Sequence, residues 1–300
     1  MPSGPSTDDI ISTPALPGRR RAADIVSIAL ILVAAATLPF AREPGPMVPA
    51  FLPAFETTIV TIDLLTAYLL WGQFLVARRL GAALLGAAYL FSGLIAVPHL
   101  MVFPGAFAPD GLLGAGSQSA SWSWIAWHGG FPVMVAAYAI VDWKGSPVLP
   151  ERLVRPVLAA LLLGVGALIV VRTILFTWGH DLLPQMIDEG DYLLLVTSGV
   201  GPILWIVNAA ALGSVLLLLR RRTMVQLWLG VAMLAALLDV TVNLFAQQRY
   251  TIGSAIRKAM SASAAWRARS TRRSGDPPMS PPAMAARNSR SFSPIPTRPA

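Results

Sequence analysis

Six polar residues interrupt apolar stretches of the sequence that are otherwise long enough to cross a membrane. Charged groups at that depth are costly, so each residue is a candidate for a site. A basic residue among them, Arg172, could neutralise one of the acids, Asp63 or Asp239. The result would be either a ligand-binding polar cavity or a structural ion pair that only fixes helix register. The set consists of Asp63, His99, His128, Arg172, Asp239 and Asn243.

Aromatic residues accompany two of the histidines. In the stretch WSWIAWH, Trp124 and His128 are four residues apart and share a helix face, with Trp127 beside them. These indoles either line the site or form an interfacial aromatic belt. Phe103 and Phe107 belong to FPGAFAP, where prolines and glycine favour a rigid turn. This turn could cap a cavity as a lid, dip into lipid or form a buried plug.

The sequence offers little for metal or catalytic chemistry. Imidazole binds zinc and haem, but the histidines lack a paired spacing such as HxxxH, so His99 and His128 are only weak metal candidates. The absence of cysteine excludes disulfides and thiolate sites. No P-loop, GxSxG, HExxH or Gly-rich dinucleotide turn is found. We therefore expect no cofactor, no metal and no enzymatic activity in this chain.

The composition explains why the polar residues stand out. Of the 300 residues 55% are hydrophobic and only 13% are charged, against roughly 25% charged in soluble domains. Several apolar runs have about the 20 residues that a membrane-spanning helix needs. We predict an all-α polytopic membrane bundle of about seven helices. The predicted spans are approximately 25–40, 55–77, 80–98, 122–142, 155–176, 197–219 and 225–246. The first span lacks a small-x-small cleavage site and should be retained.

Basic residues predict the orientation. They occur at 19–21, 78–79, 144–155 and 220–222, in alternate connections, which places the N-terminus in the cytoplasm of a bacterial inner-membrane protein. Seven spans would then leave the C-terminus outside. This conflicts with residues 251–300, which hold nine Lys/Arg and one acid and thus the whole net charge of +8.

Three segments of the sequence resemble a known family. They are IDLLTAYLLWGQF (Ile62–Phe74), the run Ala87–Ala139 containing PHLMVFPGAF and WHGGFP, and RYTIG (Arg249–Gly253). They resemble the type-4 membrane-associated sensor domain of bacteria, the MASE group, over roughly residues 20–253. The resemblance implies an eight-helix, homodimeric sensory domain joined to a cytoplasmic diguanylate cyclase (GGDEF) or histidine kinase module. The family ligand is undefined, so no binding residues carry over.

The tail departs from the family pattern. After RYTIG an eighth helix is expected, but the sequence becomes rich in Arg, Ser and Pro, like a shifted reading frame in GC-rich DNA. We expect a disordered N-terminus (1–18), a membrane-embedded sensor (19–250) and a disordered basic tail from frameshift or truncation (251–300).

The leading hypothesis is a signal-input domain in the lipid bilayer. It would respond to a small molecule or to the state of the membrane, without nucleic acid. The alternatives are a small transporter or channel and a haem- or metal-binding membrane protein.

Overall fold

The structure is a computed structural model that describes residues 14–41, 50–186, 193–219 and 223–245. The predictions for the first residues of the chain and for the basic tail fall outside these ranges. Seven helices of the described part are long and apolar enough to cross a membrane, which confirms the predicted fold class. They are α1 (Pro17–Thr37), α2 (Phe51–Ala77), α3 (Leu80–Val102), α4 (Ser119–Asp142), α5 (Glu151–Thr177), α7 (Val200–Ser214), which spans only together with its continuation to Leu219, and α8 (Met224–Phe245).

Short elements complete the described fold. Helix α1 continues into the 3-10 turn η1 (Leu38–Phe40), and η2 (His180–Leu182) follows α5. The span predicted at 197–219 corresponds to α7 and is preceded by the short helix α6 (Leu193–Thr197). Gly199, with a positive φ of 83°, separates the two helices. A π-helical turn, η3 (Val215–Leu219), then extends α7. Such turns inside helices are frequent at functional sites.

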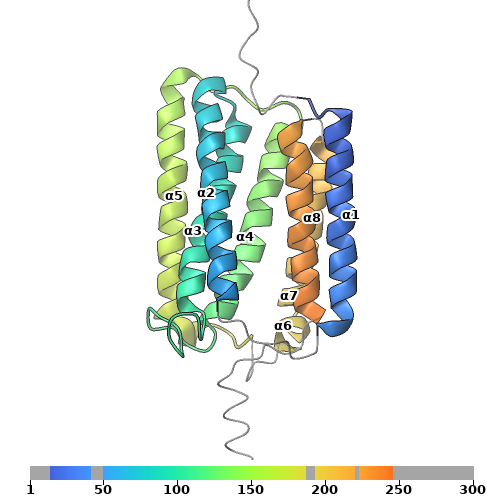
Figure 1. The fold of residues 1–300 in the computed structure, drawn as a ribbon. Coiled ribbons are helices and arrows are strands. Elements are labelled where there is room, and N and C mark those ends of the chain that lie inside the picture. The colour runs from blue at the N-terminus through green and yellow to red at the C-terminus, as the bar shows by residue number, and fades with distance from the viewer. Residues whose placement is uncertain (1–13, 42–49, 187–192, 220–222, 246–300) are drawn as a thin grey trace, which may run out of the picture. The chain divides into compact units, whose positions relative to one another are not determined.

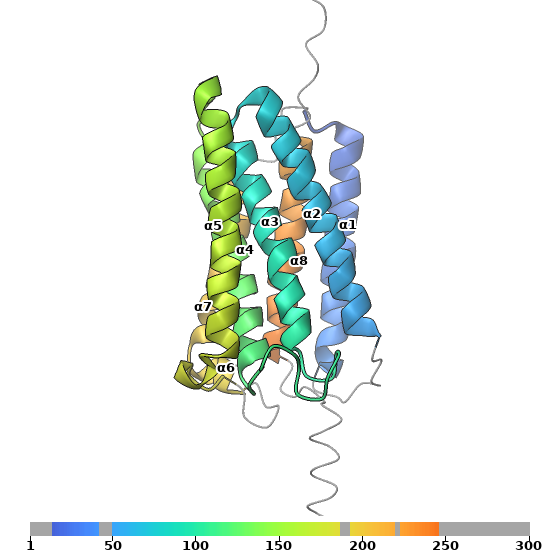
Figure 2. The ribbon, with the colours of Figure 1, turned by 90° about the vertical axis from the view of Figure 1, so that its left-hand side faces the viewer.

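The long helices stand side by side as an up-and-down bundle with two distinct ends (Figure 1). At one end, which we call the basic end, Arg78 takes a left-handed φ of 55° and closes the turn between α2 and α3. Its carbonyl accepts from the Leu149 amide at 2.8 Å, which joins this turn to the α4–α5 connection. The opposite end, which we call the far end, holds the α3–α4 connection, η2 and α6 (Figure 2).

Helix α3 is the centre of the bundle because small residues let its neighbours approach closely. A Cβ added at Gly86 would lie 2.5 Å from the Trp71 ring of α2. At Gly130 of α4 an added Cβ would lie 2.6 Å from the Phe91 ring of α3. Outward-facing apolar side chains, such as those of α5, remain exposed in the described part of the chain, as a lipid-facing surface requires.

Candidate functional site

A buried acid–histidine pair joins α2 to α3 near the far end. The Oε1 atom of Glu56 lies 2.8 Å from Nδ1 of His99, and the two side chains are only 2% and 3% exposed. The rings of Phe103 and Trp127 each pack against the imidazole with centroids 5.8 Å away. Aromatic rings and neighbouring helices thus exclude solvent from this pair.

A second acid–histidine pair joins α4 to α8 and is more open. Nε2 of His128 lies 2.8 Å from Oδ2 of Asp239, with side chains 15% and 50% exposed. On the other side of the ring, Nδ1 lies 2.9 Å from the Trp124 carbonyl, and the indole stacks on the imidazole at 4.3 Å. The shared helix face predicted for Trp124 and His128 is therefore confirmed.

The hydrogen bonds of His128 determine where its protons lie. The Trp124 carbonyl can only accept, so Nδ1 carries a hydrogen and donates it. The 2.8 Å contact between Nε2 and the carboxyl of Asp239 is a hydrogen bond only with one hydrogen between them, because neither a bare ring nitrogen nor a carboxylate oxygen can donate. The pair is neutral overall whichever atom holds this proton, which suits a membrane interior better than an isolated charge.

Two asparagines support the open pair. Asn243 donates to Oδ1 of Asp239 at 3.1 Å and so holds the carboxyl in place. Fully buried Asn208 of α7 donates to the His128 carbonyl at 2.8 Å and to the Leu204 carbonyl at 2.9 Å. The backbone that carries the histidine is therefore fixed against α7.

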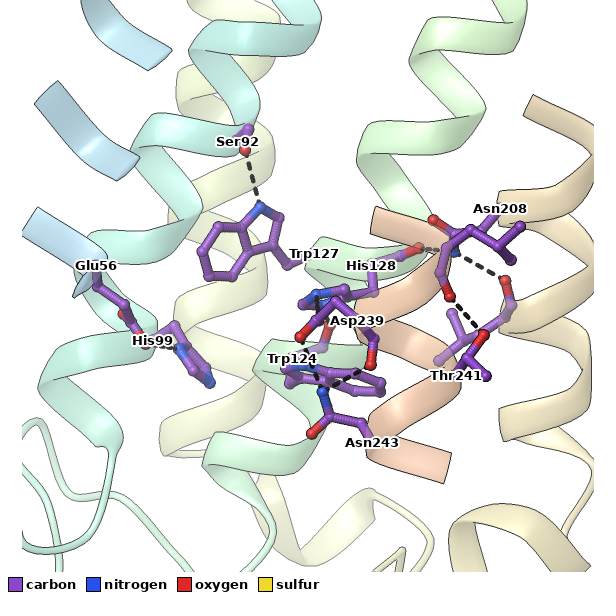
Figure 3. A network of polar contacts seen from close by, with 12 residues as sticks. Glu56, Ser92, His99, Trp124, Trp127, His128, Asn208, Asp239, Thr241 and Asn243 are labelled. Carbon is purple, nitrogen blue, oxygen red and sulfur yellow. Dashed lines mark hydrogen bonds and ion pairs between the residues drawn. The ribbon is translucent and has the colours of Figure 1, made fainter. Parts of the chain in front are cut away.

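The Trp127 ring connects the two pairs. Its centroid lies 5.8 Å from the ring of His99 and 5.5 Å from that of His128, and its Nε1 donates to Oγ of Ser92 at 2.9 Å. Ser92 also interacts with the Asp63 side chain. Figure 3 shows the resulting row of side chains across the bundle, from Glu56 on α2 to Asp239 on α8.

Arg172 does not fulfil the sequence expectation of pairing with Asp63 or Asp239. Its guanidinium is on the inward face of α5 and donates from Nη1 to Oγ of Ser123 at 2.8 Å. It also lies 5.3 Å from the Phe176 ring centroid. Histidines on α3 and α4, rather than this arginine, are the partners of the carboxylates Glu56 and Asp239.

The other predicted residues divide between the site and the surface. Phe103 covers His99, whereas Phe107 is exposed, so the α3–α4 connection is not a wholly buried plug. The third histidine of the chain, His180, was not a predicted site residue and pairs with exposed Asp181 at 3.2 Å in η2. Within the described ranges, no three His, Cys, Asp or Glu side chains gather as metal ligands.

Sequence reasoning missed Glu56 and Asn208. Glu56 is an acid near the start of an apolar run, but a predicted span beginning at 55 placed it at the membrane edge. The structure begins α2 at Phe51 and puts Glu56 inside the helix. Asn208 lies in the middle of an apolar helix, a signal of the same kind as that of Asn243.

The contacts described above come from six helices. Helices α2, α3, α4, α7 and α8 contribute to the row from Glu56 to Asp239 and its support, α5 contributes only contacts of Arg172 outside that row, and α1 contributes none. The family described as a membrane-associated sensor, integral membrane domain (MASE4) matches residues 46–255, which includes these six helices and begins after α1. No curated protein and no solved structure matches the chain. Because the match covers more than two thirds of the 300 residues, this chain belongs to the MASE4 family of integral membrane sensor domains.

Proposed function

We propose that this domain is the signal-input part of a bacterial signalling protein whose output is a cytoplasmic diguanylate cyclase or histidine kinase module. Family membership supports a sensory role in the membrane. The observation that carries the proposal further is the open pair of His128 and Asp239. It is the exposed part of a polar row that otherwise lies inside the bundle, and it ties α4 to α8.

The open pair offers a simple way to sense a polar ligand. A ligand with its own donor or acceptor would compete for the carboxyl of Asp239 or for Nε2 of His128. The polar contact between His128 of α4 and Asp239 of α8 would then be replaced by contacts of both side chains with the ligand. A ligand shifts a conformational equilibrium only by its differential affinity for the two states, and this exchange supplies such a difference.

Helix α8 is suited to carry the change to the other side of the membrane. At the far end it presents Asp239 to the site, and near the basic end its Gln226 donates to Oδ2 of Asp142 at 3.0 Å. The hydroxyl of Tyr138 lies 3.4 Å from the same carboxyl oxygen. A rotation or shift of α8 against α4 would therefore alter polar contacts at both ends.

The rest of the proposal concerns location and assembly. We assign the domain to the bacterial cytoplasmic membrane with the basic end and the N-terminus in the cytoplasm, because basic residues favour that side. We also propose that it acts as a homodimer and that this chain has no catalytic activity of its own. The stimulus is then either a small molecule that reaches Asp239 or a change in the membrane itself.

A chimera tests whether the domain is an input module. Residues 1–253 would be joined, through one added transmembrane helix, to a GGDEF cyclase, and cyclic di-GMP would be measured in cells. Asp239→Asn should change the output, whereas Asp110→Asn, at an exposed loop position, should not. Equal output from the parent and both variants would contradict the proposal.

The expected frameshift or truncation has its own test. The DNA downstream of codon 253, read in the other frames, should encode an apolar helix followed by an output module.

A further inference from the structure

The Arg172 side chain is a buried cation with two free donors. The residue is 6% exposed, and within the described part of the chain it is in no ion pair with a carboxylate. Nη1 donates to Ser123, but Nε and Nη2 have no hydrogen-bond partner among the residues that the structure describes. Buried cations normally have a counter-ion, because an unpaired charge in an apolar interior is unfavourable.

The identity of the two free atoms indicates what they bind. The N–H groups of Nε and Nη2 are parallel on one edge of the planar guanidinium. This edge matches the two oxygens of a carboxylate or a phosphate and binds them in a bidentate manner. Ser123 accepts from Nη1 and retains its own hydroxyl hydrogen, a third donor beside the arginine.

The surroundings supply polar groups beside an otherwise largely apolar helix. Three buried serines, Ser119, Ser121 and Ser123, are on the first turns of α4, and Ser119 donates to the Phe176 carbonyl at 2.5 Å. Arg172 is five residues before the end of α5, about 7.5 Å from the far end. Arg172 therefore lies close to the end of the membrane-spanning helix, where the headgroup region of a bilayer begins.

We propose that Arg172, with Ser123, binds an oxyanion, namely a carboxylate or a phosphate group. The anion comes either from an anionic lipid headgroup or from a small solute. Its two oxygens accept from Nε and Nη2, and the guanidinium neutralises its charge. The site is separate from the His128–Asp239 pair, and anion binding is measured on the domain itself, so the proposal stands whichever output module is used.

The sequence contains one internal competitor for this role. Asp188, Glu189 and Asp191 follow closely after Met186, whose amide donates to Gln118 at the start of α4. If one of these acids were the counter-ion, no external anion would be needed. The experiment therefore includes a variant in which all three are neutral.

Binding and thermal stability of the purified full chain test the proposal. In nanodiscs of phosphatidylcholine, inorganic phosphate should bind and raise the unfolding temperature, as a ligand of the folded state does. In nanodiscs containing phosphatidylglycerol without free phosphate, native mass spectrometry should retain bound anionic lipid. Phosphate binding alone identifies a solute site, and lipid retention identifies a headgroup site; either supports the proposal.

Variants distinguish a specific site from general charge effects. Arg172→Gln should weaken binding by about tenfold or more, since a bidentate charged contact is lost. Arg172→Lys keeps the positive charge but lacks the two parallel N–H groups of the guanidinium, so it should also bind the anion more weakly than the parent. The control Arg152→Gln, at an exposed position outside the site, should bind normally.

Two results would overturn the proposal. One is that neither phosphate nor phosphatidylglycerol binds the parent chain. The other is that anion binding is unchanged by Arg172→Gln. If, in addition, the triple variant Asp188→Asn, Glu189→Gln, Asp191→Asn is strongly destabilised, the chain's own acids are the counter-ion.

Discussion

The two acid–histidine pairs have the same contact distance but different burial, so they should differ strongly in their effect on stability. In both pairs a carboxylate oxygen is 2.8 Å from a ring nitrogen. The side chains of Glu56 and His99 are almost fully buried, whereas that of Asp239 is half exposed. Truncating Glu56 and Asp239 to alanine therefore compares one interaction in two environments.

The expected magnitudes follow from that difference. Glu56→Ala leaves His99 without its carboxylate in a closed space, and breaking a buried pair costs about 3–5 kcal/mol. This corresponds to roughly two to four orders of magnitude in the unfolding equilibrium constant. Asp239→Ala removes a pair whose carboxyl is half exposed, and exposed pairs are worth about 1 kcal/mol or less.

Denaturant unfolding of the purified chain in micelles, followed by helical circular dichroism, gives both free energies. Exposed Asp110→Ala serves as the control and should leave the free energy of unfolding unchanged. A cost for Asp239→Ala as large as that for Glu56→Ala would refute the argument from burial. A cost below 1 kcal/mol for Glu56→Ala would show that the buried pair is no stabilising contact.

Three further results are expected. Gly130→Ala should destabilise the chain by about 1–3 kcal/mol through overpacking against Phe91, whereas Gly164→Ala, in open space on α5, should be neutral or slightly stabilising in chemical denaturation. Because the chain has no cysteine, Asp110→Cys and Lys144→Cys can be labelled separately in intact cells with a membrane-impermeant maleimide. Only the former should react; the reverse pattern would contradict the proposed orientation. Cells that overproduce the chain should show no rise in cyclic di-GMP, and the purified chain no autophosphorylation; either activity would disprove the proposed lack of catalysis.

The fold was predictable because it depends on local properties of the sequence. Apolar runs of sufficient length identify the spans, and seven such helices are present in the described residues. Helix starts were less accurate, because polar residues at a helix terminus resemble a loop. The sequence predicts a connection at Ser119 and Ser121, but both are buried in α4, and Ser119 donates to a carbonyl 57 residues away.

The partners within the site were not predictable from the sequence. Glu56 and His99 are 43 residues apart, and no spacing rule relates them. The expectation that Arg172 neutralises an acid followed from charge alone, whereas the structure places a serine and a phenyl ring beside it. Depth in the membrane and residue type identify candidate site residues. The rotation of each helix about its own axis decides which of these residues come into contact.

The central claim is that the His128–Asp239 pair, which ties α4 to α8, sets the signalling state of the domain. A double-mutant cycle in the cyclase chimera tests it, with His128→Asn, Asp239→Asn and both together, and cyclic di-GMP as the readout. If the pair acts as one unit, each single variant shifts the output and the double variant shifts it no further. Output equal to the parent in all three variants, or a double variant whose effect is the sum of the single effects, would contradict the claim.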